Sequence, residues 1–245
     1  MKLEKITISG ANEHTDIKEL SDLLYRYPKA EIGIQVSDKK ASYDSKRYEW
    51  FFALHNYVLR LKQNINVALH INPGWVEKVC EGYMPIELLK MMTLKNSDGS
   101  LFVKRLQLNF LIGREPAPDM DKLYWVINSF NSRRFIFTYN DANRNFIRKY
   151  YQRYGNCFDL LVDSSHGEGK TPEKWEPVIF PDVFQSYSGG LSPDNIEQAL
   201  DSIAAVNRTD IGIGIDAEGK LKGDDGHLSL EKAEAYLEKA SRWCR

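Results

Sequence analysis

The chain has 245 residues, and its 33 lysines and arginines nearly balance its 34 aspartates and glutamates. This length suits one large domain, residues 1–245, and the balanced charge argues against nucleic acid or an anionic membrane surface as a partner. No apolar run reaches the roughly 18 residues of a membrane helix, and residues 1–10 lack the apolar core of a signal peptide. We therefore expect a cytoplasmic protein, either a monomer or a homodimer.

The cysteines and histidines do not form a metal-binding or disulfide pattern. The three cysteines are far apart, and none is paired at CxxC spacing, which disfavours both a disulfide framework and a zinc site. The five histidines fall on different predicted elements without the spacing of metal ligands. We expect no metal and no cofactor, and only His166, after the sixth predicted strand, lies near a candidate site.

Eight short β-rich runs follow one another along the chain. They occupy residues 5–9, 31–37, 66–71, 105–111, 134–139, 158–163, 183–188 and 210–216. Helical patterns with apolar residues three or four positions apart fill the gaps, as in Ile17, Leu20, Leu23 and Leu24. Eight strand-then-helix units in a domain of this size predict an α/β fold, a (βα)8 TIM barrel of the phosphate-binding type.

A doubly wound open sheet is the competing fold. It usually has fewer strand-then-helix units, and its glycine-rich turn follows the first strand. In this chain the glycine-rich turn, residues 189–195 (GGLSPDN), follows the seventh predicted strand and precedes a helical pattern that runs to Val206. This position favours the barrel, because barrels often hold phosphate on the loops after their seventh and eighth strands.

The two glycines of this turn, Gly189 and Gly190, have two interpretations. They could let the backbone approach a phosphate at the start of a helix, or they could only provide the φ angles of a strand-to-helix turn. The barrel position favours the phosphate site, and Gly219 in the loop after strand eight supplies a second glycine loop with Lys220 and Lys222 beside it. Glu218 is the exception, because a carboxylate near a phosphate costs energy unless its side chain turns away.

The end of strand six carries the strongest candidate for acid chemistry. Asp163 ends that strand, and the glycine-rich residues 164–171 that follow could fold over a ligand. A carboxyl group at the tip of a barrel strand can act as a general acid, although it could instead cap the loop backbone. At the end of strand one, the small side chain of Ser9 could either donate a hydrogen bond to a ligand or only pack.

Several short motifs together resemble the phosphoribosylanthranilate isomerase family of tryptophan biosynthesis. They are LVDSS running into GKT at residues 161–171, GGLSPDN at 189–195 and the terminal LEKAE helix at 230–234, followed by weaker matches at residues 5–10, 45–48 and 107–109. Their order spans almost the whole chain. The resemblance implies an intramolecular oxidoreductase of the isomerase class that needs no cofactor and binds a small anionic, phosphorylated sugar-type ligand.

In that family an Amadori rearrangement converts an aldose-like imine into a ketose-like enamine. By resemblance, Asp163 would be the acid that protonates the ring oxygen, Ser9 would occupy the place of the cysteine base, and Arg47 would contact the anthranilate end. The resemblance also assigns the phosphate to Gly189, Gly190 and Gly219.

The chain departs from the family pattern in three places, one of which covers two residues. Ser9 stands where the family has cysteine, Asn109 stands where it has histidine, and Ala217 with Glu218 replaces two serines. A serine hydroxyl stays protonated unless an adjacent base activates it, whereas a thiol titrates near pH 8.5.

These departures leave several hypotheses open. The chain could be an isomerase-like enzyme with a changed reaction, and Asp216 or Asp141 could then supply the base. Asp141 could instead cap the helix that we predict from Ala142. The alternative is a non-catalytic isomerase-like barrel used for ligand binding or assembly, and a true tryptophan-pathway isomerase that uses serine is a third reading.

One segment is longer than a minimal helix and loop. Residues 78–104 contain a methionine-rich stretch and the turn signal Asn96-Ser97-Asp98-Gly99. The sequence is compatible with a lid over the site or with an oligomer contact.

Overall fold

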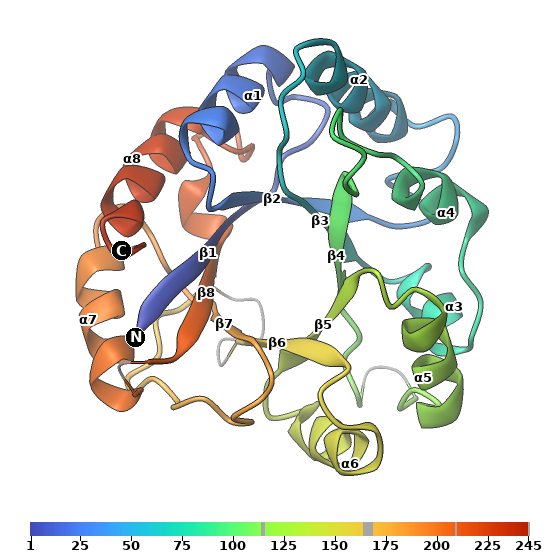
Figure 1. Cartoon of the computed structure of the whole chain (residues 1–245), viewed down its shortest axis with the longest axis vertical. Helices are drawn as coiled ribbons and strands as arrows, with labels where there is room; N and C mark the ends of the chain where they lie inside the picture. The colour runs from blue at the N-terminus through green and yellow to red at the C-terminus, as the bar shows by residue number, and fades with distance from the viewer. Residues whose placement is uncertain (114–115, 164–168, 209, 245) are drawn as a thin grey trace.

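Eight parallel strands form a closed barrel in a computed structural model that describes residues 1–113, 116–163, 169–208 and 210–244 (Figure 1). Each strand pairs with the next along the chain, and β8 pairs with β1. The strands are β1 (Lys2–Ser9), β2 (Ala30–Val36), β3 (Val67–Ile71), β4 (Val103–Leu108), β5 (Arg134–Tyr139), β6 (Phe158–Val162), β7 (Gln185–Tyr187) and β8 (Gly212–Ala217). The predicted (βα)8 barrel is confirmed.

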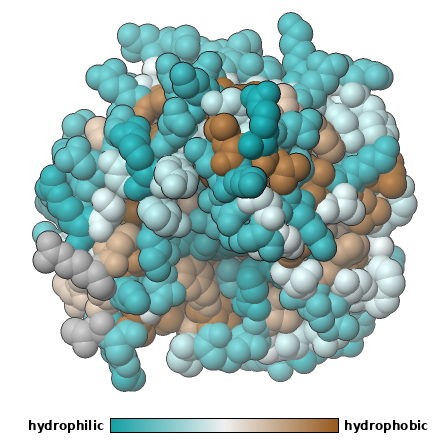
Figure 2. Space-filling model, turned by 45° about the horizontal axis from the view of Figure 1, so that its top comes forward, coloured by the Kyte–Doolittle hydropathy of each residue, from teal (hydrophilic) through white to brown (hydrophobic). Residues whose placement is uncertain are grey.

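Helices surround the barrel (Figure 1). Their buried apolar side chains belong to the same core as those of the strands. They are α1 (Ile17–Arg26), α2 (Lys46–Arg60), α3 (Val76–Cys80), α4 (Ile86–Met92), α5 (Met120–Ser129), α6 (Arg144–Tyr154), α7 (Ile196–Val206) and α8 (Leu230–Ser241), with the 3-10 helix η1 (Gly219–Leu221) after β8. The face in Figure 2 is largely hydrophilic, with apolar patches between polar side chains. None of the described helices is long and apolar enough to cross a bilayer.

The connection from β6 to β7 departs from the expected strand-then-helix pattern. Its described residues form no helix. Instead, Trp175 and Phe180 are buried, with the Trp175 ring edge-on to Tyr187 at 5.9 Å and the Phe180 ring stacked on Tyr151 at 4.1 Å. These aromatic contacts cover a side of the barrel where a helix would otherwise pack.

The long segment 78–104 contains a second helix of the β3–β4 connection, α4. Leu88, Met91 and Met92 of α4 are buried against the core. An antiparallel bridge between Lys95 and Leu101 closes the turn that follows. None of residues 78–104 lines the cavity described below, so the methionine-rich stretch serves packing on the outside of the barrel.

The inside of the barrel contains charged side chains. Arg105 on β4 donates to Glu31 on β2 at 2.9 Å and lies 3.4 Å from an oxygen of Asp159 on β6. Lys5 pairs with Glu31, and Arg134 pairs with Asp159. The side chains of Arg105, Glu31 and Asp159 are at most 5% exposed. Burial opposes the ionisation of Glu31, but Arg105 and Lys5 hold its pKa below the ordinary value.

Removing this arginine should therefore destabilise the barrel strongly. We expect Arg105→Leu to lower the free energy of unfolding by about 3–5 kcal/mol at pH 7, because Glu31 and Asp159 would lose a buried counter-charge. Chemical denaturation measures this change. The matched control is Arg208→Leu, since Arg208 pairs with Asp210 on the surface, with side chains 80% and 66% exposed, and should cost less than about 1 kcal/mol. Equal losses in the two variants would contradict the prediction.

Candidate active site

A cavity of about 520 Å³ opens at the carboxyl ends of the strands, where (βα)8 barrels carry their active sites. The strands contribute to its lining the side chains of Gln35, His70, Gln107, Thr138, Asp163 and Asp216. The predicted phosphate loops, with Gly189, Gly190 and Gly219, line the same cavity. Ser9 and Arg47 are not among its lining residues.

A buried hydrogen bond joins the ends of β1 and β8. The Ser9 hydroxyl donates to Oδ1 of Asp216 at 2.7 Å. Ser9 is 1% exposed and Asp216 is 8% exposed, and Asp216 is the member of the pair that lines the cavity. A carboxylate at the cavity wall therefore lies next to the hydroxyl of Ser9.

The surroundings of Asp216 raise its pKa above that of an ordinary aspartate. Burial raises its pKa to about 6, and the charges of Glu218 and Glu31 add to this effect. His70 and the hydroxyl of Ser9 act in the opposite direction by stabilising the carboxylate. Near neutral pH Asp216 can therefore both accept and release a proton, which is the property that general acid–base catalysis requires.

His70 on β3 completes this cluster. Its Nε2 atom lies 4.0 Å from Oδ2 of Asp216, and it is buried without a hydrogen-bond partner among the described residues. Gly33 on β2 makes room for the group, since a Cβ there would lie 2.3 Å from the Ser9 hydroxyl and 2.8 Å from the His70 ring. Any larger residue at position 33 would displace these side chains.

Asp163 lies beside the turn after β7. Its backbone N–H donates to the carbonyl oxygen of Tyr139 at 3.0 Å, which fixes it as a continuation of β6. A Cβ built on Gly189 would come within 3.9 Å of its carboxyl group. Asp163 and Asp216 thus line one cavity from β6 and β8, two strands apart in the barrel.

The turn after β7 needs glycine for both conformation and space. Gly189 and Gly190 have φ angles of 111° and 63°, which residues with a Cβ rarely adopt. A Cβ on Gly190 would also lie 2.5 Å from the backbone nitrogen of Thr171. Asn195 holds the turn by donating to the carbonyl of Gly190 at 2.9 Å and accepting from the N–H of Ser192 at 2.8 Å.

The start of α7 is tied to the turn that precedes it. Asn195 is the N-cap residue, but its side chain bonds back to the turn and not to the first helical N–H groups. The loop predicted to fold over a ligand comprises residues 164–171. Its residues 164–168, which include His166, lie outside the described residues. Gly169 and Thr171 pack directly on Gly190.

The loop after β8 brings positive charge to the cavity. Lys220 and Lys222 line it next to Gly219, where no atom lies within 4 Å of a built Cβ. Glu218 bonds with Gln35 at 2.9 Å and pairs with Lys222 at 3.4 Å. Its carboxylate is thus bound to Gln35 of β2, and Glu218 itself lines the cavity.

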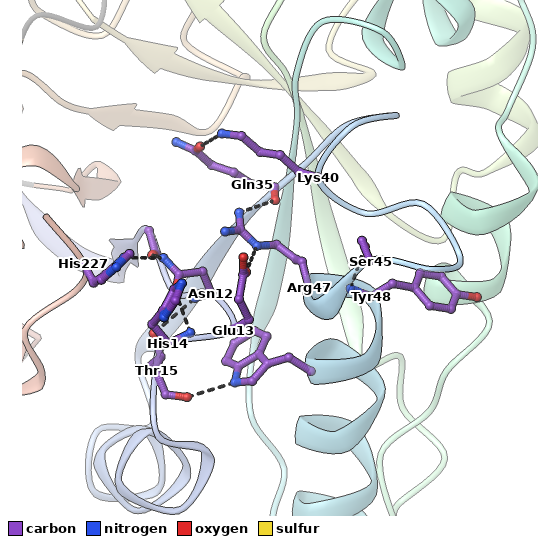
Figure 3. Close-up of polar contacts among 12 residues, drawn as sticks. Asn12, Glu13, His14, Thr15, Gln35, Lys40, Ser45, Arg47, Tyr48 and His227 are labelled. Atoms are coloured by element: carbon purple, nitrogen blue, oxygen red, sulfur yellow. Dashed lines mark hydrogen bonds and ion pairs between the residues drawn. The ribbon is translucent and has the colours of Figure 1, made fainter.

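Arg47 at the start of α2 is engaged within the protein (Figure 3). Its Nε donates to Glu13 at 2.6 Å, and its Nη1 donates to the backbone carbonyl of Gln35 at 3.2 Å. The Arg47 side chain is only 12% exposed. The anthranilate contact that the resemblance assigns to Arg47 stays a prediction, and the structure adds Glu13 as its partner.

Asp141 does not cap the following helix. Its side chain is 75% exposed and pairs with Arg144 at 3.1 Å. The neighbouring Asn140 side chain accepts the N–H of Asn143 instead, and α6 begins at Arg144. Asn140, not Asp141, lines the cavity.

Sequence reasoning missed His70, Gln35 and Asn140, although all three lie in or directly after predicted strands. Side chains alternate between the two faces of a strand, so polar residues at every second position of a buried strand indicate an inward face. In β3 to β5, the polar inward residues that line the cavity are His70, Gln107 and Thr138. The alternation of inward and outward positions along each strand could have identified these inward residues from the sequence.

Comparison with known proteins gives a likeness of fold. The chain resembles the crystal structure of phosphoribosyl anthranilate isomerase from Thermus thermophilus, with a TM-score of 0.56 over 97% of this chain and 98% of that one, at 15% sequence identity. No family model and no curated protein matches the sequence. The resemblance expected from the motifs is therefore confirmed for the barrel, and the reaction has to be argued from the cavity.

The raised pKa of Asp216 predicts a pH-dependent change in stability. Folding raises this pKa from 3.8 to about 6, so between these values the folded chain holds a proton that the unfolded chain has released, and stability falls as the pH rises. We expect Asp216→Asn to be more stable than the wild type at pH 8, by up to about 3 kcal/mol, and equally stable at pH 4.

Denaturation curves at the two pH values test this. The exposed Asp201 of α7 gives the control Asp201→Asn, for which we expect no comparable difference. A wild type that is as stable as Asp216→Asn at pH 8 would show that the buried carboxylate carries no energetic cost.

Proposed function

We propose that the cavity binds a small phosphorylated sugar-type ligand and catalyses its isomerisation by acid–base chemistry. The observation that carries the proposal is that two carboxyl groups, Asp163 and Asp216, line one cavity together with the glycine turn after β7. Two carboxyl groups in different surroundings can divide the acid and base roles between them. The fold that this chain shares with phosphoribosyl anthranilate isomerase supports the same reaction class.

The phosphate would lie against Gly189, Gly190 and Gly219. At Gly219 nothing within 4 Å opposes the approach of a ligand to the backbone. Lys220 and Lys222 add positive charge on the same side of the cavity. Backbone N–H groups at a glycine turn and nearby cations are the features that hold phosphate on the last two loops of such barrels.

The reaction that fits is an Amadori-type rearrangement. Asp163 would donate its proton to the ring oxygen of a glycosylamine, so that the C1–O bond breaks and a protonated imine forms. The base would then remove the proton from C2. The electron pair of the broken C2–H bond would form the C1–C2 double bond of the aminoenol, and the π electrons of the protonated imine would move to its nitrogen. Tautomerisation then moves the proton of the C2 hydroxyl to C1 and gives the ketose. The base releases its proton to solvent and Asp163 takes one up, so both groups return to their starting states without any oxidant or cofactor.

For the base we propose the Ser9–Asp216 pair, with Asp216 as the group that reaches the ligand. The pKa of about 6 leaves Asp216 mostly ionised at neutral pH and still basic enough to accept a proton. Ser9 donates a hydrogen bond to Oδ1 and so orients the carboxylate. In this arrangement a serine can replace the family's cysteine, because the neighbouring carboxylate supplies the basicity.

Asp163→Asn should abolish turnover and leave the melting temperature within a few degrees of the wild type. The amide cannot donate the proton that opens the ring, and loss of a general acid costs about 100-fold to 10,000-fold in rate. Conversion of phosphoribosylanthranilate, followed by its fluorescence, measures the effect, and Asp201→Asn serves as the surface control. Unchanged turnover in Asp163→Asn would remove it from the acid role. A wild type that binds sugar phosphates without turning over this substrate would favour a changed reaction or the non-catalytic alternative.

Gly219→Ala separates phosphate binding from folding. Because the built Cβ meets no atom within 4 Å, we expect an unchanged melting temperature. The methyl group would occupy the space through which a phosphate approaches the backbone, so the affinity for ribose 5-phosphate should fall about tenfold or more. Calorimetric titration of wild type and variant gives the ratio. Equal affinities would place the phosphate elsewhere.

A further inference from the structure

The side of the cavity opposite the glycine turn has a different chemical character. In a closed ring of eight strands, β3 and β4 lie across the barrel from β7 and β8. Apart from His70, the polar residues that β3, β4 and β5 and the residues directly after them contribute to the cavity wall are uncharged: Asn72, Gln107, Asn109, Thr138 and Asn140. We call this group the amide rim.

Hydrogen bonds orient the amide rim. Gln107 donates to the side-chain oxygen of Asn109 at 2.9 Å, and Asn109 donates to the side-chain oxygen of Asn72 at 3.0 Å. Each carboxamide has two N–H groups and two lone pairs on its oxygen. The two hydrogen bonds from Gln107 to Asn109 and from Asn109 to Asn72 therefore use only part of the donors and acceptors of these side chains. The rim therefore presents both donors and acceptors to the cavity.

The rim is also held rigidly by its supports. The buried Asn143 donates to the carbonyl groups of Phe110 and Thr138 at 2.9 and 3.0 Å and accepts the N–H of Ile112 at 3.1 Å. These bonds tie the loop after β4 to β5. The hydroxyl of Thr138 is buried without a hydrogen-bond partner among the described residues. An unpaired hydroxyl at a fixed position is costly unless a ligand bonds to it.

Charge in the cavity disfavours an anionic group at the amide rim. Among the described lining residues, the lysines are Lys220 and Lys222, both in the loop after β8, while Asp163, Asp216 and Glu218 contribute three carboxyl groups.

The cations beside β2 already bond to protein oxygens (Figure 3). Lys40 donates to Gln35, and Arg47 donates to Glu13. A ligand carboxylate at the rim would lose its water shell without gaining a cation, which is unfavourable.

We infer that the ligand's end remote from its phosphate is uncharged and carries both a donor and an acceptor, as a carboxamide does. This inference rests on the proposed function and specifies its substrate class. A carboxamide matches the amide rim group for group, and Phe110 and Pro73 beside it provide apolar surface for a ring. An anthranilate carboxylate does not match, so this chain and an anthranilate-binding isomerase would differ at this end of the ligand.

Two stable probes that differ only at this group test the inference. Reductive amination of ribose 5-phosphate with 2-aminobenzamide or with anthranilic acid gives fluorescent amino-ribitol phosphates that carry a carboxamide or a carboxylate. We expect the carboxamide probe to bind at least tenfold more tightly, a difference of about 1.4 kcal/mol. Fluorescence titration of the full chain gives both affinities, and ribose 5-phosphate provides the phosphate reference.

Thr138→Val probes the rim itself. The substitution removes a hydroxyl without a partner among the described residues and keeps the shape, so the fold should be at least as stable. We expect the affinity for the carboxamide probe to fall several-fold while that for ribose 5-phosphate stays unchanged. Thr93→Val is the control, because Thr93 bonds to the carbonyl of Lys90 on the outside of the barrel.

The outcomes separate the two proposals. Equal binding of the two probes, or tighter binding of the carboxylate probe, would overturn the inference. If ribose 5-phosphate still bound, the proposed function would remain intact. Binding of neither probe and no binding of ribose 5-phosphate would overturn both. A fall in ribose 5-phosphate affinity in Thr138→Val would also contradict the inference, because it would place the phosphate end at the rim.

Discussion

The ion pairs of Arg105 fix the interior on which the cavity rests. A barrel of eight strands must fill its centre with inward side chains, and this chain places carboxylates there from β2 and β6. Arg105 compensates Glu31 and Asp159 in a region almost without exposure. A buried charge without a partner is costly, so these contacts stabilise the arrangement in which β2, β4 and β6 bring their charged side chains together. They also keep the carboxylate of Glu31 buried near Asp216, whose pKa its charge helps to raise.

The effect reaches the cavity through Asp216. Its pKa is raised first by burial and then by the nearby carboxylates, including Glu31 of the Arg105 cluster. Ser9 and His70 oppose this by stabilising the anion, and Gly33 leaves the space that both need. The result is a carboxylate that titrates near neutral pH in a cavity wall. The hydroxyl of Ser9 on β1 donates to this carboxylate from the neighbouring strand.

The two ends of the cavity differ in the charge and the hydrogen-bonding groups that line them. Glycine backbone and lysines gather at the loops after β7 and β8, whereas carboxamides gather at β3 to β5. The barrel separates these groups by its diameter, so a ligand must extend across the strand ends to meet both. Asp163 follows β6 and Asp216 lies on β8, so they flank β7 on the side of the cavity that carries the glycine turn.

The barrel could be predicted from the chain alone, because strand and helix periodicities are local and eight repeats leave few other folds. Strand ends and glycine-rich turns are also visible along the chain, so Asp163 and the glycine loops could be singled out as candidates, and they line one cavity. The partners of these side chains could not be predicted in the same way. Ser9 and Asp216 are 207 residues apart, and Arg47 meets Glu13 from another loop. Closure of the ring brings such groups within hydrogen-bond distance, and no periodicity in the chain encodes which inward side chains then meet.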